Sequence, residues 1–199
     1  MGPAAGAEVV EMGAKQQAGA FANMGADFYS GGGSGKVFVK KEDVVTPVQA
    51  ITDRARLEGI EVLRGPGSPN GTEDEVARLA SVSDLIVVIG ATTAAEMSDR
   101  AHLHMEWWCD TLIEMVASLK PTVVLMQSPG AMVTPFRGSV AAVANLFLAG
   151  EETGHAWASM LFGDMNPSGK LPVMFPASHA DTVEPWGVQG PYLEGVFTS

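Results

Sequence analysis

Three ionisable side chains lie close together near the middle of the chain: Glu96, Asp99 and Arg100. A carboxyl group can act as a general acid or base, and its flanking residues Ala95 and Met97 are apolar. Such neighbours would desolvate the carboxyl group and raise its pKa toward the range useful for a proton donor. The residues alone leave two interpretations open, a catalytic Glu96 or a solvated loop carboxylate. Asp99 and Arg100 are expected to organise the loop through hydrogen bonds and ion pairing.

Strands and helices alternate along the chain that must position these residues. Residues 84–90 form a continuous apolar run, which is typical of a parallel strand covered on both faces. The pattern predicts a three-layer α/β/α sandwich with a mostly parallel five- or six-stranded sheet. Ligands bind at the carboxyl ends of such strands, which places residues 91–103 at the functional edge. The segments expected to be strands are 9–13, 60–63, 84–90, 121–126 and 171–176, with a further apolar segment at 140–148; those expected to be helices are 46–57, 72–80, 107–119 and 153–162.

The glycine-rich residues 31–35 do not have the spacing of a phosphate-binding loop. Ser30 and Val37 stand where that loop needs a glycine and a serine or threonine. The dinucleotide-binding pattern fails at Lys36. Two interpretations stay open, a flexible connection or a tight loop whose backbone packs closely against a neighbour.

Composition excludes several classes of partner. The net charge is −11 and only 12 residues are basic, so nucleic acid is not an expected partner. No stretch has the ~18–20 apolar residues of a membrane span, and the start of the chain lacks the pattern of a signal peptide. A membrane partner is therefore not expected, and the compartment is left undecided.

No metal or cofactor is predicted. The four histidines have no metal-ligand spacing, and a single cysteine cannot form a thiolate cluster. That cysteine, Cys109, is expected to be a buried and inert thiol in a helix.

Several separate segments of the chain resemble the second domain of glycoside hydrolase family 3, and they occur in the order found in the family. The similarity spans roughly residues 30–197. The stretch Phe-Gly-Asp-x-Asn-Pro-Ser-Gly-Lys-Leu-Pro is its most specific part. The segments that carry the resemblance are 31–35, 45–47, 96–100, 161–176 and 192–195.

This resemblance implies a retaining β-glycosidase of the β-glucosidase or β-xylosidase type, acting on terminal β-linked sugars. In the family a barrel domain binds the sugar and supplies an aspartate nucleophile. The α/β sandwich domain supplies the acid/base glutamate, which corresponds to Glu96, while Asp99 and Arg100 would shape its loop. Retaining chemistry needs two carboxyl groups ~5–5.5 Å apart.

The resemblance also implies a domain organisation that is incomplete. Residues 1–29 are poorly patterned with one candidate strand, 30–177 form the sandwich domain, and 178–199 form an extended arm leading toward a missing β-sandwich domain. A barrel needs about 200–250 residues, for which the chain has no room. The Ser-Asp-Trp context of the family nucleophile does not occur. The nucleophile is therefore expected from a barrel domain or a partner chain, and the chain alone is expected to be inactive.

A second function is compatible with the same residues. The chain could be a non-catalytic carbohydrate-binding or protein-interaction module derived from such a domain. Sugar binding that does not depend on Glu96 would distinguish it from the acid/base domain.

Overall fold

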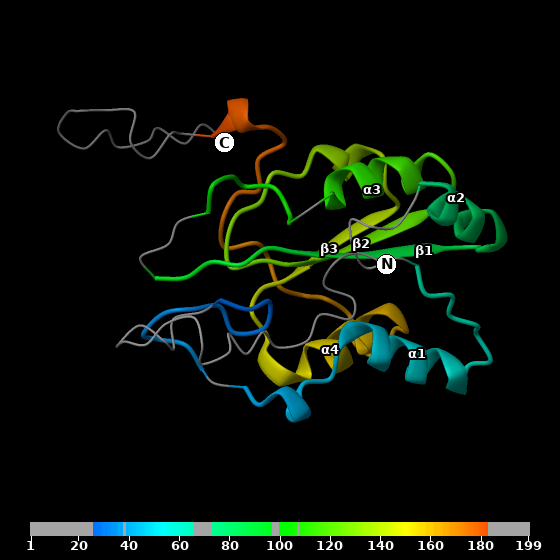
Figure 1. The fold of residues 1–199 in the computed structure, drawn as a ribbon, viewed down its shortest axis with the longest axis horizontal. Coiled ribbons are helices and arrows are strands. Elements are labelled where there is room, and N and C mark those ends of the chain that lie inside the picture. The colour runs from blue at the N-terminus through cyan, green and yellow to red at the C-terminus, as the bar shows by residue number, and fades with distance from the viewer. Residues whose placement is uncertain (1–25, 38, 66–72, 97–99, 107, 183–199) are drawn as a thin grey trace.

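The computed structural model describes residues 26–37, 39–65, 73–96, 100–106 and 108–182. At their centre lies a parallel sheet with the order β1-β2-β3, formed by Ile86–Ala91, Thr122–Gln127 and Ala142–Leu146 (Figure 1). These strands confirm the two apolar runs expected as strands, and they show that the apolar segment 140–148 contains the third strand.

Helices cover both faces of the sheet, which confirms the three-layer architecture. On one side lie α1, Pro47–Leu57, and α4, Thr153–Leu161; on the other lie α2, Glu73–Val82, and α3, Cys109–Ala117 (Figure 1). Short 3-10 helices complete the described elements: η1 (Lys41–Asp43), η2 (Pro135–Gly138), η3 (Gly150–Glu152) and η4 (His179–Asp181). No helix among the described residues has the length and apolar character needed to cross a bilayer.

The core is divided into two halves by the sheet. Successive side chains of a strand point to opposite faces, and both Val88 and Ile89 are fully buried. Val88 packs with residues of α3 such as Ile113, whereas Ile89 packs with Ile51 of α1 and Trp157 of α4. This double burial explains the continuous apolar run of β1.

The prediction of five or six strands is wrong for the described residues, which contain a three-stranded sheet. Residues 171–176 are not a strand: the carbonyls of Phe175 and Pro176 accept hydrogen bonds from Arg137 and Thr134 instead of joining the sheet. Two prolines in this segment remove ladder donors. The expected strand at 9–13 lies outside the described residues.

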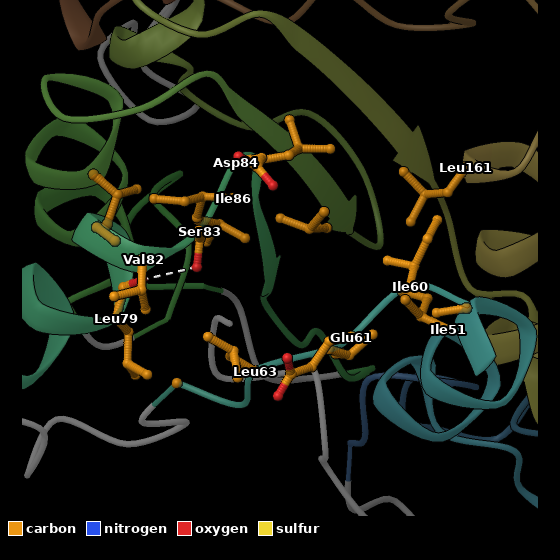
Figure 2. A pocket seen from close by; sticks show the side chains of 18 of the residues that line it. Ile51, Ile60, Glu61, Leu63, Leu79, Val82, Ser83, Asp84, Ile86 and Leu161 are labelled. Atoms are coloured by element: carbon orange, nitrogen blue, oxygen red, sulfur yellow. Dashed lines mark hydrogen bonds between the residues drawn. The ribbon is translucent and has the colours of Figure 1, made fainter. Parts of the chain in front are cut away.

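The expected strand at 60–63 is also absent. These residues do not pair with the sheet, and an apolar groove lies between them and β1. Within the described residues, β1 pairs only with β2, so its other edge is free of ladder partners. A groove of about 640 Å³ runs along this edge (Figure 2). Its walls include Ile60 and Leu63 from the extended segment and Leu79 and Val82 from α2. Local β propensity was thus correct about extended backbone and wrong about pairing.

The segment after α4 is tied to α1 by Asp164. Both carboxylate oxygens of Asp164 accept hydrogen bonds from the Arg54 guanidinium, each at 3.1 Å. The same guanidinium lies 5.0 Å from the centroid of the Phe162 ring. Gly163, between Phe162 and Asp164, has φ +77°, a conformation that glycine adopts easily and that lets the chain turn after α4. This cluster gives the most specific stretch of the resemblance a structural role.

The described part of the C-terminal arm is not extended throughout. Residues 179–181 form η4, whose first turn is closed by reciprocal hydrogen bonds between Ser178 and Asp181. Residues 1–25 and 183–199 lie outside the described residues, so the domain boundaries at 29 and 177 stay predictions.

Substituting Gly154 by alanine should destabilise the domain by about 1–3 kcal/mol, because the added methyl group overpacks the start of α4. A Cβ there would contact the carbonyl oxygen of Val45 and lie 2.6 Å from that of Thr46. Urea unfolding followed by circular dichroism measures the effect. Gly138→Ala is the matched control, since a Cβ at that position has no neighbour within 4 Å. Equal unfolding midpoints for the two variants would contradict the prediction.

Candidate functional site

The loop that follows β1 leaves the sheet at the carboxyl ends of the strands. Its first residue, Thr92, donates from its backbone N–H to the carbonyl of Gln127 at 3.1 Å. Further along, the N–H of Glu106 donates to the carbonyl of Ala91 at 2.8 Å, and the Thr92 hydroxyl donates to the Glu106 carboxylate at 3.0 Å. Both described ends of the loop are therefore fixed to the sheet edge expected to bind ligands.

Glu96 lies against the glycine-rich loop. The N–H of Gly32 donates to the carbonyl of Ala94 at 3.0 Å, and the N–H of Glu96 donates to the carbonyl of Gly32 at 3.3 Å. A Cβ on Gly33 would lie 2.6 Å from the Glu96 Cβ. Of the two interpretations of residues 31–35, the structure supports the tight loop packed against a neighbour.

The carboxylate of Glu96 is exposed and held by Ser34. The backbone N–H of Ser34 donates to Glu96 Oε2 at 2.7 Å. Hydrogen bonds from Ser34 lower the pKa of Glu96 below its usual value, with the larger effect from the Ser34 side chain and the smaller from its backbone N–H. The expectation of a raised pKa is therefore wrong for this chain, because the carboxylate is solvated and donors stabilise its charged form.

Of the two residues expected to organise the loop, the structure describes only Arg100. Asp99 lies outside the described residues. Arg100 is half-buried, and its Nη1 lies 3.0 Å from the sulfur of Met132 in the segment after β2. Burial lowers the pKa of Arg100, while the charge of Glu106 acts in the opposite direction. The structure thus brings Arg100 to the same sheet edge as Glu96, and its role stays a prediction.

Sequence reasoning missed a set of polar side chains where β2 and β3 end. The Gln127 side chain donates to the carbonyl of Phe28 at 3.2 Å, and the Ser128 hydroxyl donates to Asn145 at 2.9 Å. Gln127 Oε1 and Asn145 Nδ2 are buried and have no hydrogen-bond partner among the described residues. The detectable signal was polar residues directly following, or interrupting, apolar strand runs.

The histidines are closer in space than their spacing suggested. The rings of His102 and His104 are 5.8 Å apart between centroids, and those of His104 and His179 are 4.9 Å apart. His104 Nδ1 lies 2.5 Å from a carboxylate oxygen of Asp110, whose pKa is raised by burial. Among the described residues, no three histidine, cysteine or acidic side chains are arranged to hold a metal ion.

Cys109 faces the core from the first turn of α3. It is fully buried, and burial raises the pKa of its thiol to about 12. A thiol of this kind is not a nucleophile at neutral pH. This confirms the expectation of a buried, inert cysteine.

Comparison with known proteins places this geometry in a family. Residues 6–199 match the family described as Glycosyl hydrolase family 3 C-terminal domain. The chain belongs to this family. The identification agrees with the resemblance found in the sequence, and it assigns the sandwich and its Glu96 loop to a family 3 C-terminal domain.

Similar curated proteins are β-glucosidases. The family 3 domain is 31% identical over 175 residues to a periplasmic β-glucosidase of Salmonella typhimurium, covering 80% of this chain and 23% of the relative. It is 33% identical over 168 residues to a β-glucosidase of Rhizobium radiobacter, covering 75% of this chain and 20% of the relative. The chain thus spans about a fifth to a quarter of the length of these relatives.

Solved structures support the fold. The β-D-glucoside glucohydrolase of Trichoderma reesei superposes with a TM-score of 0.66 at 27% identity, over 81% of this chain and 24% of the other. The β-glucosidase D2-BGL of Chaetomella raphigera has a TM-score of 0.71 over 91% of this chain and 26% of the other. Its 22% identity makes it a likeness of fold alone.

Proposed function

We propose that this family 3 domain supplies the general acid/base, Glu96, of a retaining β-glycosidase of the β-glucosidase or β-xylosidase type. The substrate would be a terminal β-linked glycoside. The observation that supports this role is the position of the carboxylate, exposed at the carboxyl edge of the sheet and fixed 2.7 Å from the Ser34 N–H. An exposed but oriented carboxylate can meet a substrate held by another domain.

The mechanism needs a second carboxylate that this chain is proposed not to contain. In a retaining reaction a nucleophile attacks the anomeric carbon while the acid protonates the departing oxygen. The same residue then removes a proton from the water that hydrolyses the glycosyl-enzyme intermediate. Glu96 would perform both proton transfers, and a barrel domain, fused or on a partner chain, would bind the sugar and supply the nucleophile.

In the isolated chain, the lowered pKa of Glu96 suits the second of these proton transfers, the removal of a proton from water. An ionised carboxylate can accept a proton from water, but it cannot donate one to a leaving group. A docked barrel would desolvate Glu96 and place a negative nucleophile beside it, and both effects raise the pKa of a carboxyl group. The acid function would therefore develop only in the assembled site.

Asp99 and Arg100 would hold the loop that carries Glu96. Arg100 is suited to this because it is half-buried and contacts Met132 in the neighbouring loop. Neither residue is proposed to touch the reacting atoms.

A chimeric enzyme tests the proposal. Residues 6–199, the range of the family match, would replace the corresponding domain of the Rhizobium radiobacter β-glucosidase, a relative that is 33% identical over 168 residues. We expect the chimera to release nitrophenol from a nitrophenyl β-glucoside and the isolated chain to release none, because the nucleophile is proposed to come from the barrel domain. Turnover by the isolated chain that Glu96→Gln abolishes would overturn this part of the proposal.

The same materials separate the alternative, a non-catalytic module. That function would appear as saturable binding of β-glucosides to the isolated chain that Glu96→Gln does not change, with no hydrolysis by a correctly folded chimera. Isothermal titration calorimetry measures the binding. Hydrolysis by the chimera that is lost in its Glu96→Gln variant would dispose of the alternative.

A further inference from the structure

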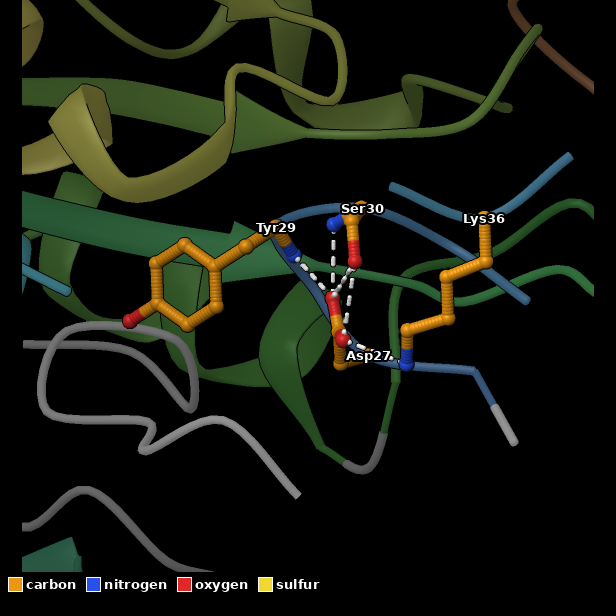
Figure 3. A network of polar contacts seen from close by, with 4 residues as sticks. All are labelled: Asp27, Tyr29, Ser30 and Lys36. Atoms are coloured by element: carbon orange, nitrogen blue, oxygen red, sulfur yellow. Dashed lines mark hydrogen bonds and ion pairs between the residues drawn. The ribbon is translucent and has the colours of Figure 1, made fainter. Parts of the chain in front are cut away.

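A buried carboxylate organises the chain just before the glycine-rich loop. Asp27 is fully buried, and its Oδ1 accepts hydrogen bonds from the N–H groups of Tyr29 at 2.8 Å and Ser30 at 2.6 Å (Figure 3). The Ser30 hydroxyl also donates to it, at 3.0 Å to Oδ2. A buried charge needs such partners because an unsatisfied one strongly destabilises the folded state.

The same carboxylate closes the loop from its far end. Lys36 Nζ lies 2.8 Å from Asp27 Oδ2, with side chains only 10% and 1% exposed (Figure 3). The chain between the two residues contains the whole run 31–35. Two backbone hydrogen bonds also hold the two ends of this segment to the glycine run. The Asp27 N–H donates to the Gly31 carbonyl, and the Lys36 N–H donates to the Gly33 carbonyl. The glycine-rich run is therefore held as a ring.

This ring is anchored to the sheet. The carbonyl of Phe28 accepts from the Gln127 side chain at 3.2 Å, where β2 ends. The carbonyl of Tyr29 accepts from the N–H of Gly150 at 3.0 Å, where η3 begins. The ring thus has a fixed position relative to the strand ends, and its free side carries Ser34.

We infer that the Asp27–Lys36 ion pair is a positioning device for Glu96. The pair closes the glycine-rich ring, the ring presents the Ser34 donors, and these donors set the orientation of the Glu96 carboxylate. Asp27 and Lys36 do not touch the reacting atoms and act through the glycine-rich ring, whose Ser34 N–H holds the Glu96 carboxylate. The inference rests on the proposed role of Glu96 for its catalytic meaning, but its physical content is a coupling between two sites that can be measured without catalysis.

Titration of the Glu96 carboxyl group in the full chain measures this coupling. Carboxyl carbon signals of a chain labelled with ¹³C-glutamate are followed against pH, and the Glu96 signal is the one missing from Glu96→Gln. We expect Lys36→Met and Asp27→Asn both to raise the titration midpoint of Glu96 toward that of an ordinary glutamate. Lys40→Met, which removes one charge from an exposed lysine nearby, is the matched control and should leave the midpoint unchanged.

The two variants also separate positioning from simple charge effects. Lys36→Met removes a positive charge and would raise the pKa of Glu96 by electrostatics alone, whereas Asp27→Asn removes a negative charge and would lower it. An upward shift in both variants therefore reports displacement of the Ser34 donors. A wild-type midpoint in Lys36→Met, or shifts of opposite sign in the two variants, would overturn the inference.

Failure of the inference is distinguishable from failure of the proposed function. The Lys36 side chain is less completely buried than that of Asp27, at 10% against 1% exposed, so Lys36→Met keeps the test available if Asp27→Asn does not fold. Midpoints that shift as expected, together with a chimera that keeps its turnover after Glu96→Gln, would uphold the positioning and reject the acid/base role. Unshifted midpoints with an inactive Glu96→Gln chimera would do the reverse.

Discussion

Replacing Glu96 with glutamine should lower kcat/KM of a barrel-containing chimera on cellobiose by about 10²–10⁴-fold, the usual contribution of a positioned general acid or base. The amide oxygen of glutamine can still accept the hydrogen bond that Ser34 donates at 2.7 Å. The substitution therefore keeps the packing of the loop while removing the transferable proton. Steady-state kinetics on purified proteins measures the change.

The loss should depend on the leaving group. A dinitrophenolate departs as a stable anion and needs little protonation, so the glycosylation step of dinitrophenyl β-glucoside should slow far less than that of cellobiose. Glu42→Gln serves as the control because that side chain is exposed and lies outside the site. Equal losses on both substrates would contradict a general-acid role, and unchanged turnover of cellobiose would remove Glu96 from the mechanism.

Replacing Gly33 with alanine should have the second-largest effect, about a 10²-fold fall in kcat of the chimera, as expected when a catalytic group is displaced by about 1 Å. The new methyl carbon would lie 2.6 Å from the Glu96 Cβ, so either the glycine-rich loop or the segment that carries Glu96 must move. Gly33 also has φ +117°, a conformation that side-chain-bearing residues rarely adopt. The strain should lower stability by roughly 1–3 kcal/mol.

Gly35→Ala provides a close control for this prediction. It lies two residues further along the same loop, and a Cβ there has no neighbour within 4 Å. We expect it to retain the turnover and the unfolding midpoint of the unmodified chimera. A Gly33→Ala variant with unchanged kcat would show that the contact between the loop and Glu96 does not matter for catalysis.

Local patterns predicted the elements whose identity is decided locally. The runs that became β1 and β2 are apolar because residues such as Val88 and Ile89 are buried on opposite faces. The start of α1 was predictable from Pro47, since proline is favoured in the first helical turn, and the structure adds a cap: the Thr46 hydroxyl accepts from the N–H of Gln49 at 3.3 Å. Strand pairing is different, since it depends on a neighbouring strand that local sequence does not specify. For this reason residues 60–63 were expected in the sheet and instead line the groove beside β1.

The pKa of the candidate catalytic residue was likewise not predictable from local sequence. Glu96 was identifiable from its position after β1 and from the family resemblance, but its pKa was judged from its two chain neighbours. The donor that controls it, Ser34, is 62 residues away in the sequence. Likewise, nothing local indicates that Asp27 and Lys36 meet across the glycine run. Contacts of this kind follow from the fold and cannot be obtained from spacing.

The contact between Ser34 and Glu96 has an evolutionary consequence. Both residues belong to one domain, so the group proposed to transfer protons and the donor that tunes it are inherited together. Sugar recognition would belong to a separate domain. A substitution at Ser34 could therefore move the pH optimum of an enzyme while leaving its choice of sugar untouched, and recombination between domains could exchange one property without the other.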